Sequence, residues 1–277
     1  MHSEKYIDDS RLEWWDPVWL QHVATTFQFS HARRICDLGA GSGHWAQTLA
    51  QALPWQDAEV VALDAEPGWV AALEANKTLA ALVAKLEAVR GDARDTGLPS
   101  NSFDLVTCQT LALHLSDPAA LVREMIRLAK PGGKIVMAEP VNVMNRAQSG
   151  AAIACLEPHE AGLLMEIWMA YHKGVRLENH VDYDIALRLK GIIEKCGINS
   201  QDIYCFNNPK TIPILQGDDL TDEYNEANLA YALKGGIDLA KWNEGYNIAK
   251  KLSSIHKSGM FVNALFLFCF TAPSRTS

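Results

Sequence analysis

The sequence lacks any apolar run long enough to cross a membrane, since a spanning helix needs about 20 consecutive apolar residues. Its most apolar stretch, MFVNALFLFCF at 260–270, is shorter, and its aromatic and branched residues favour a buried strand. The opening residues, MHSEKYIDDS, also lack the basic start and apolar segment of a secretory signal. These absences predict a cytoplasmic protein without a membrane span.

Cysteine patterns typical of disulfides or metal sites are missing as well. The six cysteines include no CxxC pair, and most of them lie within apolar runs. Such cysteines are typical of reduced, buried thiols in a cytoplasmic protein. No cysteine and histidine cluster has the spacing of metal ligands, so we expect no metal site.

An excess of basic charge is absent too. Lysine and arginine number 25 against 33 acids, which gives a formal net charge of −8. Proteins that bind nucleic acids usually present a basic face, whereas the densest charge runs here, EKYIDD and DDLTDE, are acidic. The charge therefore disfavours DNA or RNA as the substrate. Oligomeric state is not predicted.

Residues 33–140 alternate between short apolar runs and segments with apolar residues at helical spacing. Five runs are predicted to be strands: RRICDL, AEVVALD, KLEAVRGD, FDLVTC and GKIVMAE. Three segments between them are predicted to be helices: WAQTLAQAL, PGWVAALEANKTLAALVA and DPAALVREMIRLAK. In the last, Asp117 before Pro118 is a favourable helix start. This alternation predicts an α/β fold, with a mostly parallel sheet covered by helices on both faces.

The flanking regions are predicted to be additions to one domain spanning 1–277, because no repeat or low-complexity linker divides the chain. An N-terminal helical segment is expected first, with a helix starting at Asp16-Pro17. The other expected parts are helical insertions at 144–177 and 218–257, an amphipathic helix at 182–197, and final strands at 202–206 and 260–270. The N-terminal segment covers residues 1–30.

The stretch ICDLGAGSGHW at 35–45 places three glycines at every second position after an apolar strand. Glycine lets the chain turn tightly and lets a ligand approach the backbone. A dinucleotide site has the spacing GxGxxG, but here His44 stands where its last glycine would be. Asp37, two residues before Gly39, would repel a pyrophosphate and favour a cationic group.

With these residues, DLGAGSG resembles the first motif of class I S-adenosylmethionine-dependent methyltransferases. Further motifs follow in the family's order over about 105 residues: VVALD, GDARDTGLPSNSFDLV and LALHLSDPAALVREMIRLAKPGGKIVMAEP. The resemblance implies a Rossmann-like sheet of seven strands, mostly parallel with an antiparallel last strand. It also implies S-adenosylmethionine as methyl donor and helical insertions that form a lid, as in bacterial small-molecule methyltransferases.

The resemblance implies where the donor would bind. Asp64 would accept hydrogen bonds from both ribose hydroxyls, since a carboxylate suits a diol. Asp92 would accept from the adenine amino group, and Ala93 would offer its backbone N–H to the ring. The complete set of expected donor contacts is Asp37, Gly39, Ala40, Gly41, Gly43, Asp64, Ala65, Asp92, Ala93, Gln109 and Tyr6.

The acceptor side is less clearly marked. Displacement from a sulfonium mainly needs alignment and exclusion of water, and needs a base only if the nucleophile must lose a proton. His114, after the fourth strand, is a candidate general base, a pocket-lining residue or a packing residue, and Glu139 is a second catalytic candidate. Three residues of the first insertion are predicted either to pack the lid or to line the substrate pocket: Leu164, Trp168 and Tyr171.

The function predicted from these features is methyl transfer to an O, N or C atom of a small, apolar or aromatic metabolite. A protein or nucleic-acid methyltransferase is an alternative, disfavoured by the acidic charge and by QTLA at 109–112, where base-methylating enzymes carry other signatures. A non-catalytic S-adenosylmethionine-binding protein is a third possibility. The GxGxG spacing disfavours a related nicotinamide enzyme.

Overall fold

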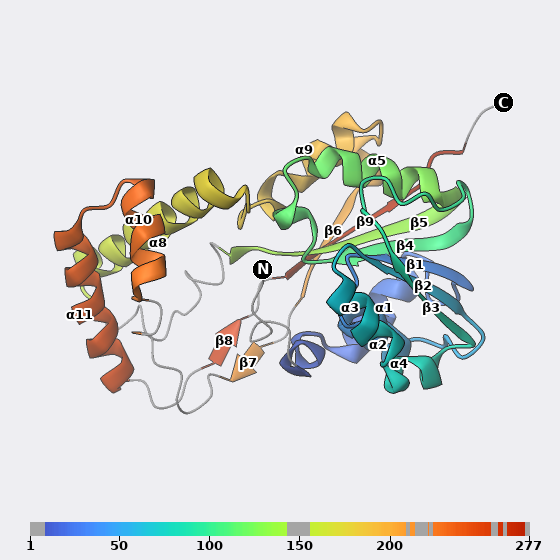
Figure 1. Ribbon diagram of the computed structural model, residues 1–277, viewed down its shortest axis with the longest axis horizontal. Helices are drawn as coiled ribbons and strands as arrows, with labels where there is room; N and C mark the ends of the chain where they lie inside the picture. Colours follow the sequence, from blue (N-terminus) through green and yellow to red (C-terminus); the bar gives the residue numbers. More distant parts are fainter. Residues whose placement is uncertain are drawn as a thin grey trace.

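The computed structural model describes residues 9–142, 156–208, 211–213, 221, 224–255, 260–262 and 265–274. Within them, a sheet carries helices on both faces, and three further helices stand beyond one end of the sheet (Figure 1). We call these three the outer helices; they are α8 (Pro158–Asn179), α10 (Glu226–Gly235) and α11 (Leu239–Ile255).

The sheet has seven strands in the order β3-β2-β1-β4-β5-β9-β6. All neighbouring strands are parallel except at β9, which is antiparallel to both β5 and β6. The strands are β1 (Arg34–Leu38), β2 (Glu59–Asp64), β3 (Lys85–Arg90), β4 (Phe103–Gln109), β5 (Ala129–Pro140), β6 (Tyr204–Asn207) and β9 (Leu265–Thr271). The predicted Rossmann-like fold class is therefore confirmed.

Helices cover both faces of this sheet, as the sequence predicts (Figure 1). Leucines of α5 and α9 pack on one face, and apolar residues of α1 to α4 pack on the other. The helices are α1 (Pro17–Thr26), α2 (His44–Ala52), α3 (Pro67–Glu74), α4 (Lys77–Leu82), α5 (Pro118–Leu128) and α9 (Ala186–Lys195). Short 3₁₀ turns are η2 (Asp9–Trp14), η3 (Ala112–His114) and η4 (Ser200–Asp202). The expected N-caps are confirmed, since Asp16 and Asp117 side chains accept from Trp19 N and Ala120 N.

The segment 67–84, predicted as one helix, forms two helices, α3 and α4. Asn76 separates them, because its Oδ1 accepts from Leu79 N at 2.9 Å and caps α4. Its Nδ2 donates to Ser42 O at 2.9 Å and to Gln47 Oε1 at 3.2 Å. The break thus lets one side chain cap a helix and also fasten the loop that precedes α2.

The predicted last strand at 260–270 is likewise divided. Residues 265–271 form β9 between β5 and β6, whereas β8 (Met260–Val262) pairs with β7 (Thr211–Pro213) in a separate two-stranded sheet. The expected pairing of the final strands is confirmed for β6 and β9, with Tyr204 opposite Cys269.

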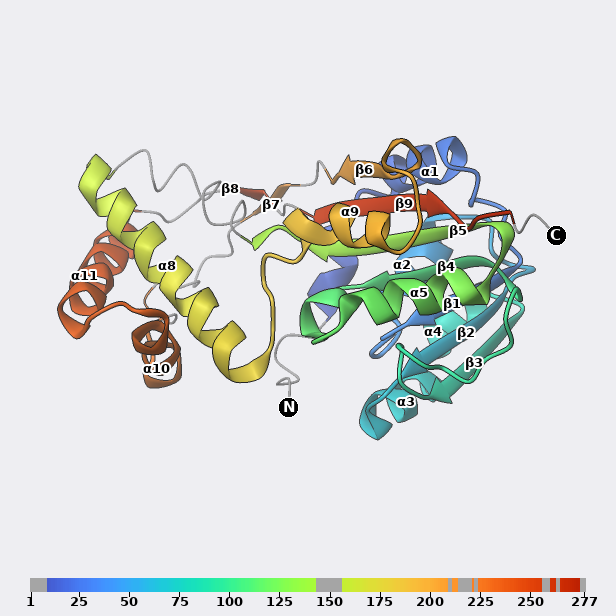
Figure 2. The ribbon, with the colours of Figure 1, turned by 90° about the horizontal axis from the view of Figure 1, so that it is seen from above.

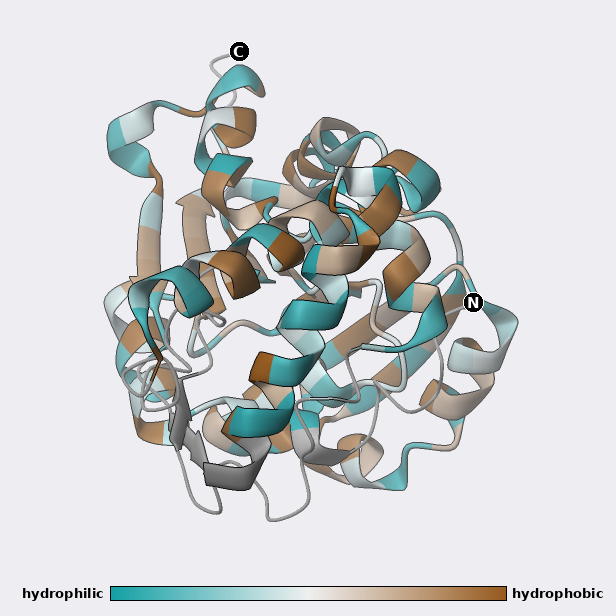
Figure 3. Cartoon of the chain, turned by 90° about the vertical axis from the view of Figure 1, so that its left-hand side faces the viewer, coloured by the Kyte–Doolittle hydropathy of each residue, from teal (hydrophilic) through white to brown (hydrophobic). Residues whose placement is uncertain are grey.

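The outer helices correspond to the two predicted insertions. They are set apart from the sheet in both views, with β5 running towards them (Figure 2). Apolar residues of all three helices or their connections form one cluster, including Ile167, Ala232 and Trp242. Seen with the left-hand side of Figure 1 towards the viewer, hydrophobic and hydrophilic residues are interspersed along the helices (Figure 3). Residues 144–155 of the first insertion lie outside the described residues, and the single-domain organisation stays a prediction.

The crossing of α8 and α10 is unusually close. A Cβ added at Gly174 would overlap the Tyr231 carbonyl, and one added at Gly235 would overlap the Ala170 carbonyl. Only glycine at these positions lets the two backbones approach this far. No helix among the described residues is long and apolar enough to span a membrane.

Candidate functional site

The glycine loop, residues 39–43, joins the carboxyl end of β1 to α2. Gly39, Gly41 and Gly43 have φ values of +65°, +56° and +92°, which side-chain-bearing residues rarely adopt. A Cβ at Gly39 would lie 2.6 Å from Leu111 Cδ1, whereas one at Gly41 would meet nothing within 4 Å. The middle glycine therefore exposes its backbone to open space, where a ligand can approach.

Asp64, at the carboxyl end of β2, holds this loop in place. Its Oδ2 accepts from Gly41 N at 2.9 Å, and its Oδ1 accepts from Glu66 N at 3.0 Å. Each oxygen retains a second lone pair, so the carboxylate can also accept from a bound diol. The neighbouring Ala65 is exposed, and Ala40 N donates to Leu63 O at 3.0 Å.

Asp37 lies next to the loop but is completely buried. Burial raises the pKa of this carboxyl well above its usual range, the nearby Asp64 raises it further, and the Ala46 backbone N–H opposes them. Protein atoms cover the whole side chain, so direct contact with a ligand would require it to move. The contact of Asp37 with the donor therefore stays a prediction. In this structure its carboxyl lies by the Ala46 N–H and so supports α2.

The expected adenine contacts lie after β3. Asp92 is exposed, and its carboxylate pairs with Arg94, with Nη2 and Oδ2 2.7 Å apart. This hydrogen bond and ion pair lower the pKa of Asp92. An adenine amino group would therefore share a carboxylate that Arg94 already occupies, which the sequence did not indicate. Ala93, which stands between Asp92 and Arg94 in the sequence, is buried.

Buried polar atoms gather at the carboxyl end of β4. Gln109 Nε2 and Thr110 Oγ1 are buried and have no hydrogen-bond partner among the described residues. Thr110 also has φ of +54°, and its N–H donates to Ala138 O at 2.8 Å. Native proteins rarely leave buried polar groups unpaired, so this point is a candidate place for a polar ligand or an ordered water.

Glu139, at the end of β5, is completely buried and binds the turn after β4. Its Oε1 accepts from Leu111 N at 2.9 Å and from Ala112 N at 2.7 Å. Burial raises the pKa of Glu139 to about 7, although those N–H groups and that of Leu113 oppose the shift. Since its carboxyl is enclosed, Glu139 does not face a substrate. The half-buried His114 lies on η3, which this carboxyl fastens.

The 180–185 loop follows α8 and connects it to the same turn. Asp182 N donates to Leu113 O at 2.7 Å, next to His114 in the chain. Asn142 Nδ2, just past β5, donates to Tyr183 O at 2.8 Å. These two hydrogen bonds place the C-terminal end of α8, which we call the foot of α8, beside the carboxyl edge of the sheet. The glycine loop lies at the same edge.

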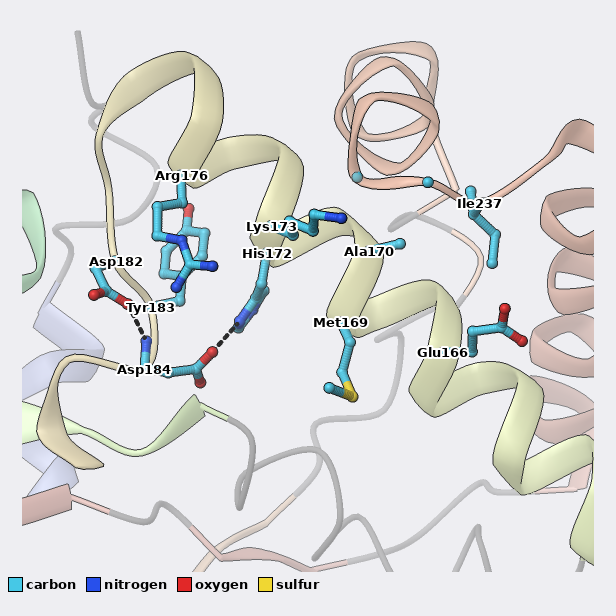
Figure 4. Close-up of a pocket in the computed structure, with 12 residues that line it drawn as sticks. Glu166, Met169, Ala170, His172, Lys173, Arg176, Asp182, Tyr183, Asp184 and Ile237 are labelled. Carbon is cyan, nitrogen blue, oxygen red and sulfur yellow. Dashed lines mark hydrogen bonds and ion pairs between the residues drawn. The ribbon is translucent and has the colours of Figure 1, made fainter. Parts of the chain in front are cut away.

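A cavity of about 400 Å³ opens between α8, the 180–185 loop and the end of α10 (Figure 4). Its lining residues are Glu166, Met169, Ala170, His172, Lys173, Arg176, Asp182, Tyr183, Asp184, Gly235, Gly236 and Ile237. Its three carboxylates are all paired, Asp184 with His172, Asp182 with Arg188 and Glu166 with Lys241.

The cations of this cavity are not all paired. Lys173 and Arg176 lie one turn apart on α8 and have no ion-pair partner among the described residues. Burial and the positive charge of Arg176 together lower the pKa of Arg188. Two guanidinium groups are thus close enough to repel each other, and a bound anion would relieve this repulsion.

The pocket residues expected from the sequence do not line this cavity. Trp168 packs on His172, with ring centroids 3.7 Å apart, and Tyr171 stacks on Tyr183 at 6.2 Å. Leu164 packs against apolar residues of α11. The structure thus shows these three side chains in packing contacts. The sequence did not indicate the charged residues of α8 that line the cavity, because exposed Lys and Arg on a helix give no specific signal.

Two further expectations are the contact of Tyr6 with the donor and the lack of a metal site. Tyr6 lies outside the described residues. Within the described ranges, no group of three or more His, Cys, Asp or Glu side chains could hold a metal ion.

Residues 36–137 match the family model of the methyltransferase domain. A ubiquinone biosynthesis O-methyltransferase of Xanthomonas oryzae is 30% identical over 155 residues, 51% of this chain and 60% of that protein. A demethylmenaquinone methyltransferase of Staphylococcus epidermidis is 30% identical over 122 residues, 44% of this chain and 49% of that protein. The chain thus spans only about half to 60% of these relatives.

A solved structure agrees on the fold over a longer span. A "putative methyltransferase" of Bacillus halodurans superposes with a TM-score of 0.53 at 19% identity, covering 93% of this chain and 99% of that one. Together with the family model and the relatives, it confirms the resemblance that the sequence motifs indicate.

Proposed function

Residues 36–137 belong to the methyltransferase domain family, and from this premise we propose that the chain transfers a methyl group from S-adenosylmethionine to a small metabolite. The observation that carries the proposal is the glycine loop, which Asp64 fixes at 2.9 Å with Gly41 open to a ligand. A backbone that is open yet held rigidly can receive a nucleoside ligand at little ordering cost.

The bound donor would supply a methyl group on a sulfonium, and the neutral thioether of S-adenosylhomocysteine would be the leaving group. The protein then has to hold donor and acceptor in line and keep water out. Asp64 would hold the ribose, and the turn after β4 would carry His114 towards the acceptor. His114 would accept a proton only if the attacking atom carries one. The relatives named above include an O-methyltransferase, and the attacking atom here is proposed to be O, N or C.

We place the acceptor between the carboxyl edge of the sheet and the foot of α8. Tyr183 provides aromatic surface there, which fits the expected aromatic metabolite. The cavity adds Lys173 and Arg176, whose charges are unpaired among the described residues. The acceptor best suited to both is an aromatic or apolar molecule that carries an anionic group. Cytoplasmic location and the absence of nucleic-acid substrates remain part of the proposal.

The test of donor binding is calorimetry with S-adenosylmethionine, S-adenosylhomocysteine and NADH. We expect both sulfur nucleosides to bind and NADH not to bind, because the loop has GxGxG spacing, with His44 where a dinucleotide site would have its last glycine. Binding of NADH alone would replace the proposal with a nicotinamide enzyme. Binding of the sulfur nucleosides without turnover on any acceptor pool would favour a non-catalytic binding protein.

The acceptor site predicts a selective effect at Arg176. With labelled donor and pairs of aromatic acceptors that differ by one carboxylate, the wild type should prefer the anionic member. Arg176→Gln should lower kcat/KM for that member about tenfold and leave its neutral partner unchanged, since a hydrogen bond to a charged group contributes about 1.5–3 kcal/mol. Lys250→Gln, an exposed charge change on α11, is the matched control. An equal loss for both acceptors would argue against an anion subsite.

A further inference from the structure

The turn that follows β4, residues 110–114, accepts support from the Glu139 carboxyl at two successive N–H groups. Glu139 Oε1 accepts both Leu111 N and Ala112 N, at 2.9 and 2.7 Å. The other oxygen, Oε2, is buried and has no partner among the described residues. An apolar residue at this position would leave the Leu111 and Ala112 N–H groups without their acceptor, and buried donors without partners are costly for a fold, so a carboxyl here serves the turn.

This turn contacts three parts of the candidate site. The Leu111 side chain covers Gly39 so closely that a Cβ there would lie 2.6 Å from it. Leu111 O accepts from His114 N at 3.0 Å, which sets the position of η3. Leu113 O accepts from Asp182 N at 2.7 Å, which fastens the 180–185 loop. The glycine loop, the candidate base and the foot of α8 therefore all meet one five-residue segment.

We propose that Glu139 is a positioning residue that links the glycine loop, His114 and the 180–185 loop by fixing the 110–114 turn from beneath. Its carboxylate touches no reacting atom and acts through the backbone it holds. The effect on methyl transfer rests on the proposed function. The mechanical link between Glu139 and the 180–185 loop does not, and it can be measured without any substrate.

The charge state of Glu139 sets how firmly the turn is held. Hydrogen bonds from N–H groups to an ionised carboxylate are roughly twice as strong as those to a neutral acceptor. The pKa of Glu139 is raised to about 7 by burial, so ionisation occurs near neutral pH. The turn should be held more firmly as pH rises through about 7 and less firmly as it falls.

The ionisable side chains near Glu139 include Cys108 on β4 and His114 on the turn. Cys108, one strand away on β4, has a thiol pKa raised well above its usual range by burial, by Glu139 and by Asp37. The opposing residue on β9 is Phe266, which carries no charge. His114 is the remaining titratable group on the turn itself, so its own replacement belongs in the experiment.

Amide hydrogen exchange of the full chain, in the absence of donor, tests the link. In wild type, protection of Leu111, Ala112 and Asp182, corrected for intrinsic exchange, should rise about tenfold between pH 6 and 8. Glu139→Gln keeps the shape and one acceptor oxygen but cannot ionise, so this rise should disappear at all three amides. His114→Asn should keep the rise, because Glu139 is intact in that variant.

Glu124→Gln is the matched control, because Glu124 is also buried and also accepts a backbone N–H, that of Thr96 at 2.8 Å. Its effect should remain near Thr96 and leave Asp182 unchanged. A Glu139→Gln protein that folds, and whose Asp182 protection matches wild type at every pH, would overturn the link. If Gln destabilises the fold, ¹³C-labelled glutamate in wild type supplies the test: Asp182 protection must follow the Glu139 titration, and protection that ignores it overturns the proposal. If the protein showed no methyl transfer, the exchange result would still stand, because the exchange experiment uses neither donor nor acceptor.

Discussion

Replacement of Asp64 by alanine should weaken the binding of S-adenosylhomocysteine about 100-fold. The carboxylate accepts Gly41 N and Glu66 N at 2.9 and 3.0 Å, and we propose that it also accepts the ribose hydroxyls. Each hydrogen bond to a charged group contributes about 1.5–3 kcal/mol, and about 1.4 kcal/mol is a tenfold change in affinity. Loss of the ribose bonds and of the fixed loop together therefore removes about 3 kcal/mol. Calorimetry measures the change directly.

Two further variants show whether this loss comes from the ligand or from the loop. Asp64→Asn keeps one acceptor oxygen and should lose only about tenfold in affinity, since one bond of the pair survives. Asp57→Ala removes an exposed acid on the loop before β2, which pairs with the exposed Arg33, and should bind like wild type. Unchanged binding in Asp64→Ala would remove this residue from the donor site. Urea unfolding of each variant separates a lost contact from a lost fold.

Replacement of Gly174 by alanine should separate α8 from α10. The added methyl group would overlap the Tyr231 carbonyl, which belongs to backbone and cannot rotate away. Overpacking of this kind typically costs about 1–3 kcal/mol, and a backbone obstacle places the expected loss near the upper end, at about 3 kcal/mol. Because Gly235 and Ala170 line the cavity beside this crossing, amides of α10 should exchange faster and acceptor turnover should fall. Urea unfolding, amide exchange and a turnover assay measure these three consequences.

Gly162→Ala, on the same helix, is the control for this substitution. A Cβ at Gly162 meets nothing within 4 Å, and the residue is exposed. Alanine in an exposed helix interior is favoured over glycine by about 0.5–1 kcal/mol. The two glycine replacements in α8 should therefore change stability in opposite directions. Equal effects would mean that helix propensity, and not the close crossing, governs the role of Gly174.

The sheet and the glycine loop could be predicted from sequence because local patterns specify them. Strand-length apolar runs alternate with helical periodicity across 33–140, and glycine spacing marks a turn whose φ values are positive. The helix break at Asn76 was missed because the residue is compatible with a helix by propensity. What breaks the helix is its contact with Ser42 and Gln47, more than 25 positions away in sequence.

The functional side chains were predicted less well than the fold, for a related reason. Glu139 was expected to face a substrate, since it follows a strand at the functional edge of the sheet, yet it points beneath the turn and binds Leu111 and Ala112. Asp92 was expected to be free for a ligand, but Arg94, two residues on, pairs with it. Which partner a carboxylate finds depends on side-chain geometry that spacing in the sequence does not encode.

The two-stranded sheet of β7 and β8 has a consequence for how this protein could diversify. Thr211 lies opposite Val262 and Pro213 opposite Met260, so the chain that carries α10 and α11 leaves and returns at one paired stem. A segment whose ends are already joined can be shortened, exchanged or lengthened at little loop-closure cost. The part of the cavity lined by Gly235, Gly236 and Ile237 can therefore vary among descendants, or be exchanged by design, while β1, β2 and the glycine loop stay unaltered.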